Sequence, residues 1–152
     1  MGVSLLPALP HWVWTLAISS VCGFAAWKGG PSERFGAASF YVAWLATVAV
    51  STGAGTQWGV LAVDGVLFLV LVGLALKSDR YWPLFFAGFE LLAVVTHAGR
   101  ILDPTLGSWA YRSAGQIWGY LMIGALAVGT WTAWQERRQT ARAPSPGEAT
   151  RR

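Results

Sequence analysis

Glu90 and His97 are the side chains with the clearest chemical potential, because both lie in the apolar stretch FELLAVVTHAGR at residues 89–100. Positions i and i+7 are nearly two helical turns apart, so the two groups lie only about 20° apart around a helix. Asp64 is a third ionisable group in an apolar stretch. Carboxyl and imidazole groups in such surroundings face the interior and pair with one another, so we expect Asp64, Glu90 and His97 to form a buried polar seam.

The composition is typical of an integral membrane protein. The chain has 152 residues, of which 55% are hydrophobic and only 12% charged, and its mean hydropathy is +0.47. A soluble domain has about a quarter of its residues charged. No Lys or Arg precedes the first apolar run, so we expect a retained membrane helix there and no secretory signal. The single Cys22 cannot form a disulfide within the chain.

A helix needs about 20 largely apolar residues to cross a bilayer, and five segments qualify. They are residues 11–27, 35–52, 57–76, 82–102 and 113–134, separated by charged or Gly- and Pro-containing breaks. We therefore predict an all-α fold, with a five-helix transmembrane domain over residues 1–135. Residues 136–152 are polar and rich in Arg, which predicts a disordered basic tail.

The loop charges orient the bundle, since Lys and Arg accumulate on the cytoplasmic side. With the N-terminus outside, the outer loops hold only Arg100 and Arg112. The inner side then carries all the other basic residues, namely Lys28, Arg34, Lys77, Arg80, Arg137, Arg138, Arg142, Arg151 and Arg152. This predicts an orientation with the N-terminus outside and the C-terminus inside. Trp27, Trp82 and Trp134 would lie near the inner interface, and Arg137, Arg138 and Arg142 would contact anionic lipid headgroups.

Depths along the helices pair two groups of the seam. At a rise of about 1.5 Å per residue, Asp64 and His97 lie at similar depth on antiparallel neighbouring helices. We predict a buried hydrogen bond or ion pair between them. Glu90 lies near the membrane midplane with no charged partner at its own level, so we expect its carboxyl to be neutral.

Several other residues are candidates for packing or ligand binding. Gly115 and Gly119, followed by Ala125 and Gly129, form small-residue rows that favour close helix packing, within the bundle or against a partner. His11 and His97 would lie on the same side of the membrane, where two imidazoles can ligate a haem or one can bind a quinone. No nucleophile elbow, phosphate-binding loop or zinc spacing is present, so the sequence predicts no catalytic residue, no metal site and no nucleic-acid binding.

Three stretches carry a resemblance to a known group of proteins. They are GGPSER after the first span, QWGVLAVDG opening the third and LKSDRYWPLFFAGFELLAVVTH running into the fourth. The chain resembles small uncharacterised polytopic inner-membrane proteins of alphaproteobacteria over most of residues 25–135, including Asp64, Asp79, Arg80 and His97. The resemblance implies an inner-membrane location. That family has no known activity, so it implies no role for any residue.

Three functions remain open at the level of the sequence. We expect a non-enzymatic accessory or scaffold protein without a cofactor, which packs with itself or with a membrane partner. The first alternative is a proton- or solute-coupled transport component that uses Glu90, His97 and Asp64. The second is a haem- or quinone-binding redox protein on the outer side.

Overall fold

The computed structural model describes residues 11–51, 56–103, 105 and 108–142. These residues form helices and no strand, so the predicted all-α fold is confirmed for them. The helices are α1 (His11–Lys28), α2 (Pro31–Val50), α3 (Thr56–Lys77), α4 (Trp82–Leu102) and α5 (Ser108–Arg142).

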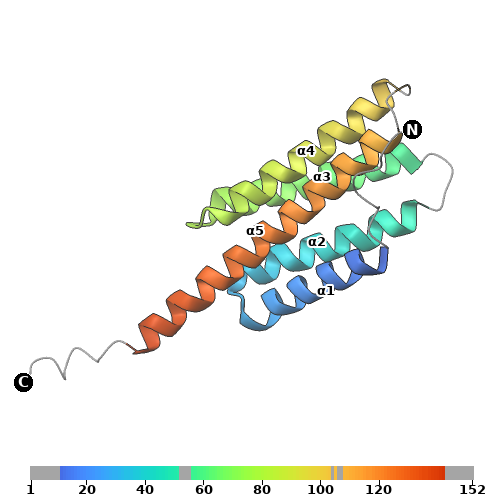
Figure 1. Cartoon of the computed structure of the whole chain (residues 1–152). Helices are drawn as coiled ribbons and strands as arrows, with labels where there is room; N and C mark the ends of the chain where they lie inside the picture. Colours follow the sequence, from blue (N-terminus) through green and yellow to red (C-terminus); the bar gives the residue numbers. More distant parts are fainter. Residues whose placement is uncertain (1–10, 52–55, 104, 106–107, 143–152) are drawn as a thin grey trace, which may run out of the picture.

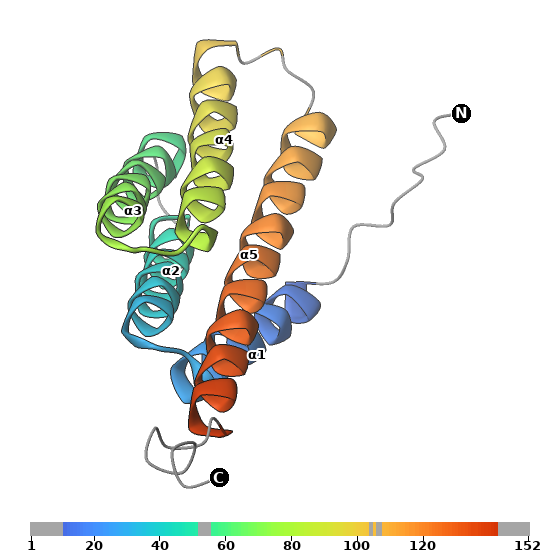
Figure 2. The ribbon, with the colours of Figure 1, turned by 90° about the vertical axis from the view of Figure 1, so that its left-hand side faces the viewer.

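The helices run along a common direction, and each packs against the next in sequence (Figure 1). The last helix, α5, lies along α4 and also contacts α1 and α2 (Figure 2). The last helix of the bundle is thus packed against the first two. The α1–α2 turn, the α3–α4 turn and the C-terminal end of α5 lie at one end of the bundle. We call this the turn end.

The predicted spans agree with the observed helices to within one residue at each end for α1, α3 and α4, whereas α2 begins four residues before the predicted span and the last helix differs most. The prediction of 82–102 coincides with α4, but α5 begins at Ser108 and continues to Arg142. The expectation of a disordered tail from residue 136 is therefore wrong for residues 136–142. QERRQTAR contains good helix formers and neither Gly nor Pro. In addition, Glu136 bonds to Arg80 and Arg137 bonds to the carbonyl of Lys28, which holds this turn against the bundle.

The helix ends follow local sequence. Pro31 and Pro83 stand in the first turns of α2 and α4, where a missing N–H removes no helical hydrogen bond. Asp103 ends α4 in an extended conformation and accepts hydrogen bonds from Thr105 Oγ1 and from the Thr105 backbone N–H at 2.9 Å. These two hydrogen bonds hold the pKa of the exposed Asp103 carboxyl below its usual range, and the bond from the Thr105 hydroxyl has the larger effect.

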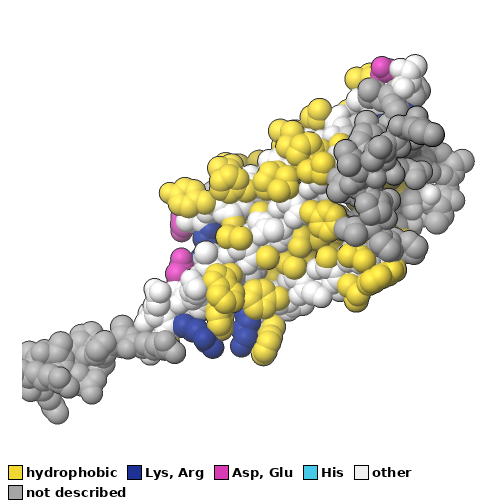
Figure 3. Space-filling model, viewed as in Figure 1, with side chains coloured by type: hydrophobic (Ala, Val, Ile, Leu, Met, Phe, Trp, Pro, Cys, Tyr) yellow, Lys and Arg dark blue, Asp and Glu magenta, His cyan; other side chains and the backbone are white. Residues whose placement is uncertain are grey.

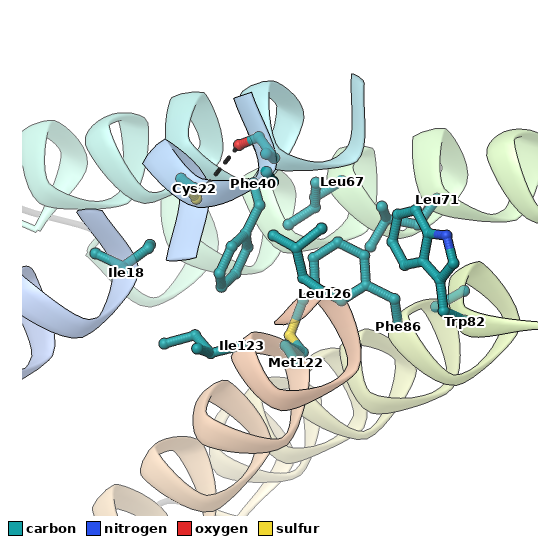
Figure 4. Close-up of a cluster of buried hydrophobic side chains, with 13 residues drawn as sticks. Ile18, Cys22, Phe40, Leu67, Leu71, Trp82, Phe86, Met122, Ile123 and Leu126 are labelled. Atoms are coloured by element: carbon teal, nitrogen blue, oxygen red, sulfur yellow. Dashed lines mark hydrogen bonds between the residues drawn. The ribbon is translucent and has the colours of Figure 1, made fainter. Parts of the chain in front are cut away.

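All five helices contribute to the apolar core of the bundle (Figure 4). Its largest side chains are aromatic. Phe86 packs edge-on to Phe40 with ring centroids 5.3 Å apart, and Trp82 lies 5.8 Å from Phe86. The sequence predicts Trp82 near the inner membrane interface, and within the bundle its side chain is only 7% exposed. Its N–H finds a buried acceptor in Glu33, which removes the need for water.

Apolar side chains cover much of the outside of the bundle as well as filling its core. Hydrophobic side chains cover much of the face in Figure 3. Large ones are exposed on every helix, for example Leu16 on α1, Val42 on α2, Leu69 on α3, Phe85 on α4 and Val128 on α5. By length and hydropathy, two stretches among the described helices are apolar enough to cross a membrane, Trp58–Lys77 and Trp82–Leu102.

Small residues of α5 make room for indole rings. A Cβ on Gly129 would overlap Cγ of Trp82, and one on Gly119 would lie 2.6 Å from Trp14 Cη2. Ala125 is partly buried on the same helix. Gly115 is exposed, and a Cβ there would meet nothing within 4 Å, so in the described part of the chain it does not pack inside the bundle, and its use against a partner stays a prediction.

Gly129→Ala should therefore destabilise the protein, because the added methyl group overlaps Trp82, whose ring cannot move without disturbing the core. Overpacking of this kind costs about 1–3 kcal/mol. Thermal unfolding of the purified variant, followed by circular dichroism, should show a lower midpoint.

Gly124→Ala is the matched control on the same helix, since a Cβ at Gly124 meets nothing within 4 Å. Its midpoint should be unchanged or slightly raised, because Ala favours a helix over Gly by up to about 1 kcal/mol. Equal midpoints for the two variants would contradict the close packing of Trp82 on Gly129.

Candidate functional site

Asp64, His97 and Tyr111 form a hydrogen-bonded chain across three helices. His97 Nε2 on α4 lies 3.0 Å from Asp64 Oδ2 on α3. Its other ring nitrogen, Nδ1, lies 2.6 Å from the Tyr111 hydroxyl on α5. The predicted contact between Asp64 and His97 is present, and both side chains are largely buried, at 15% and 17% exposure.

This hydrogen-bonded chain determines whether each imidazole nitrogen of His97 donates or accepts a hydrogen bond. When the ring is neutral and Asp64 is ionised, Nε2–H donates to the carboxylate and the Tyr111 hydroxyl donates to Nδ1. When the ring is protonated, both nitrogens donate. The His97 and Tyr111 rings also meet edge-on, with centroids 5.3 Å apart. One ionisable group thus ties α3, α4 and α5 together at the end opposite the turn end.

The sequence does not predict Tyr111 as part of this site. Its position follows the α4–α5 connection, and nothing in its neighbourhood of the sequence marks it as a polar partner. A second contact lies beside it, where Trp118 Nε1 on α5 donates to Thr96 Oγ1 on α4 at 3.1 Å. Because His97 follows Thr96 directly, two consecutive residues of α4 are held by α5.

Glu90 lies deeper in the bundle, with 3% of its surface exposed. Its inward orientation agrees with the seam predicted from the helical period. Asp64 is close enough to influence it electrostatically. Within the part of the chain that the structure describes, Glu90 Oε1 is buried and has no hydrogen-bond partner. A buried oxygen of this kind is costly unless the group is neutral.

A second polar cluster, centred on Glu33, lies at the turn end. Glu33 is 1% exposed. Its Oε2 accepts from the backbone N–H of Gly30 at 2.8 Å, and its Oε1 accepts from Trp82 Nε1 at 3.0 Å. Arg80 Nε lies 3.7 Å from the same Oε1, and Arg80 Nη2 donates to the exposed Glu136 at 2.8 Å.

Sequence reasoning missed the Glu33 cluster. A Glu in the third position of a helix commonly bonds back to the cap residue, and GPSE carries this signal at the start of α2. The partners Trp82 and Arg80 lie on another element, so the sequence alone does not bring them to Glu33. The cluster joins the α1–α2 turn, the start of α4 and the end of α5.

The arrangement does not fit a haem or quinone at His97, because both ring nitrogens are already engaged, by Asp64 and by Tyr111. The His11 side chain lies outside the described residues. Among the described residues, no group of three or more His, Cys, Asp or Glu side chains is arranged to hold a metal ion.

Comparison with known proteins adds no family, relative or template. No protein-family model, no curated protein and no solved structure matches this chain. Its function must therefore be inferred from the geometry of the two clusters and from the distribution of apolar surface.

A double-mutant cycle of Asp64→Asn and His97→Gln should reveal the contact between these residues. Groups in direct contact show coupling free energies of about 0.5–3 kcal/mol. The free energy of unfolding would be measured by titration with a denaturing detergent for the wild type, both single variants and the double variant. Asp103→Asn with His97→Gln is the control pair, because the exposed Asp103 bonds to Thr105. Coupling in the control pair as large as in the test pair would contradict the assigned contact.

Proposed function

We propose that the protein crosses the bacterial inner membrane five times, with its N-terminus outside and its C-terminus in the cytosol. The observation that carries this proposal is that large apolar side chains lie on the outside of the bundle while ionisable side chains are buried inside it. Large apolar side chains are exposed on all five helices, whereas Glu33 and Glu90 are buried at 1% and 3% exposure. Continuous exposed apolar surface marks contact with lipid or protein, and ionisable groups inside a membrane bundle face its interior.

Helices α1, α2 and α5 belong to the proposed membrane domain although they are less apolar than α3 and α4. Their Trp, Gly and Ser residues reduce hydropathy, but Trp favours the membrane interface and small residues favour helix packing in lipid. Helix α5 also continues past the apolar region as a charged segment, residues 135–142, which would extend into the cytosol.

Within this membrane domain, the role that the geometry favours is accessory or scaffolding. The polar groups of both clusters are used in contacts between helices of the same chain. Asp64, His97 and Tyr111 join α3, α4 and α5, while Glu33 joins α2 to α4. Interhelical hydrogen bonds of this kind stabilise membrane bundles without performing a reaction. The exposed Gly115 leaves part of α5 open to a second copy or another membrane protein.

A proton-coupled role is the second candidate, because the buried Glu90 carboxyl lies on the same helix as the imidazole of the Asp64–His97–Tyr111 chain. A mid-membrane carboxyl followed by imidazole, carboxylate and phenol groups toward one surface has the chemistry of a proton relay. This alternative makes Glu90 essential, whereas the accessory role does not.

The topology is tested by thiol labelling of two single-cysteine additions. Thr105→Cys stands in the proposed outer loop and Asp79→Cys in the proposed inner loop, and both positions are exposed. A membrane-impermeant maleimide should label Thr105→Cys in intact spheroplasts and Asp79→Cys only after permeabilisation. The native Cys22 is 8% exposed, so its own labelling by the maleimide should be weak. Labelling of both positions from the same side would reject five spans.

Glu90→Gln separates the accessory role from proton coupling. For the accessory role, native mass spectrometry of gently extracted wild type and variant should give the same complex, heavier than the 16.3 kDa chain by a second copy or another protein. Proton flux into reconstituted vesicles should be the same for both. A bare monomer in both samples would contradict the accessory role. Flux that is present in the wild type and lost in a folded Glu90→Gln variant would favour the second candidate.

A further inference from the structure

An open cavity of about 440 Å³ lies at the turn end of the bundle, between the α1–α2 turn and the C-terminal part of α5. Three basic and two aromatic side chains line it, together with turn backbone: Trp27, Lys28, Gly30, Arg34, Trp134 and Arg137. Among the described residues that line this cavity none is acidic. The site therefore concentrates positive charge beside indole rings.

Two of the three cations of this cavity are held by specific contacts. Arg137 Nη2 donates to the backbone carbonyl of Lys28, which fixes its guanidinium at the edge of the α1–α2 turn. The Lys28 ammonium lies 3.9 Å from the centre of the Trp27 ring. Arg34 is exposed on the first turn of α2. Guanidinium groups suit phosphate because two parallel N–H groups match two of its oxygens.

The nearest carboxylate neutralises this charge only in part. Glu33 bonds to the Gly30 N–H through Oε2, so one of its oxygens lies beside the cavity. Its other oxygen is engaged by Trp82 and lies 3.7 Å from Arg80, on the side of α4. Lys28, Arg34 and Arg137 thus leave a net positive site for an anion.

We propose that this cavity binds the phosphate of an anionic phospholipid from the cytoplasmic leaflet. The proposal rests on the proposed topology, which places the turn end at the inner surface. Basic pockets between helices on this side are suited to anionic headgroups, and Trp side chains favour the same depth.

The surroundings of the cavity favour a lipid over a free phosphate ion. Trp27 is 73% exposed, and Trp131, at 49% exposure, packs on Trp134 with ring centroids 5.1 Å apart. Figure 3 shows Lys and Arg side chains directly beside hydrophobic ones at the end from which the C-terminal trace leaves. A phospholipid presents both chemistries together, with its phosphate against the cations and its acyl chains along the apolar flank.

The test is lipid binding by native mass spectrometry on the full chain in a neutral detergent. Phosphatidylglycerol and phosphatidylcholine would be titrated separately, since they share acyl chains and a phosphate but differ in net charge. The double variant Lys28→Gln/Arg34→Gln should lose at least about tenfold in affinity for phosphatidylglycerol, because each basic side chain near the surface makes a substantial electrostatic contribution. Phosphatidylcholine should bind weakly to the wild type and to every variant.

Arg138→Gln is the matched control. Arg138 follows Arg137 and lies 3.8 Å from the Trp134 ring centre, but it does not line the cavity. Its affinity for phosphatidylglycerol should change less than about twofold. Equal losses in the double variant and in Arg138→Gln would show diffuse attraction and overturn the site, as would unchanged binding in the double variant. Circular dichroism would confirm that each variant is folded.

Two further outcomes distinguish a lipid from a free phosphate ion, and the lipid site from the proposed topology. Displacement of phosphatidylglycerol by millimolar inorganic phosphate, with phosphate itself bound by the wild type, would assign the cavity to a free phosphate and overturn the lipid. Loss of specific lipid binding with the thiol-labelling pattern intact would reject this site alone. A reversed labelling pattern would instead reject the proposed topology, whatever the binding curves show.

Discussion

The hydrogen bond from Trp82 to Glu33 is the contact on which the turn end of the bundle depends. The Trp82 indole lies between two glycines of other helices, Gly36 and Gly129, and a Cβ at either position would overlap the ring. No larger residue at either position would admit the ring unchanged. Nε1 of the same ring donates a hydrogen bond to Glu33 at 3.0 Å, so one side chain supplies both the apolar packing and the polar contact. Helices α2, α4 and α5 meet around it.

The buried Glu33 carboxylate would be strongly destabilising without its partners. A carboxylate removed from water is tolerated only when it is paired and hydrogen-bonded. Here the Gly30 N–H, the Trp82 N–H and the Arg80 guanidinium surround it. Arg80 continues to Glu136, which extends the network to the end of α5. This network links the α1–α2 turn and the last turns of α5 to one buried carboxyl group.

The sequence predicts the parts of this structure that lie on one helix or on the antiparallel pair α3 and α4. Periodicity places Glu90 and His97 on one face, and helix depth places Asp64 beside His97, because both placements follow from the rise and turn of an α-helix alone. Two partners outside the α3–α4 pair were missed. Tyr111 meets His97 from α5, and Glu33 meets Trp82 from α2. Such meetings depend on how helices rotate and tilt against one another, which a hydropathy pattern does not specify.

The same limit explains why the sequence does not predict the burial of Trp82, the exposure of Gly115 or the helix over residues 136–142. A Trp at the start of an apolar helix is typical of an interfacial anchor, and only the glycines of two other helices make a buried place for this one. A GxxxG pair predicts close approach but not which of its members is covered, and here Gly119 meets Trp14 while Gly115 is open. The basic residues 136–142 have the composition of a solvated tail, but their contacts with Arg80 and Lys28 continue the helix.

The spacing of the polar groups bears on the choice between a static and a proton-conducting bundle. Proton transfer requires neighbouring groups to be joined by hydrogen bonds or water. His97 is joined on both sides, to Asp64 and to Tyr111, but Glu90 lies about 10 Å away along α4. Its buried Oε1 has no hydrogen-bond partner in the described part of the chain. Phe86, one helical turn before Glu90 on α4, is fully buried in the apolar core together with Leu71 and Leu126 (Figure 4). Two polar anchors separated by a closed apolar core favour a bundle that holds its shape over one that conducts.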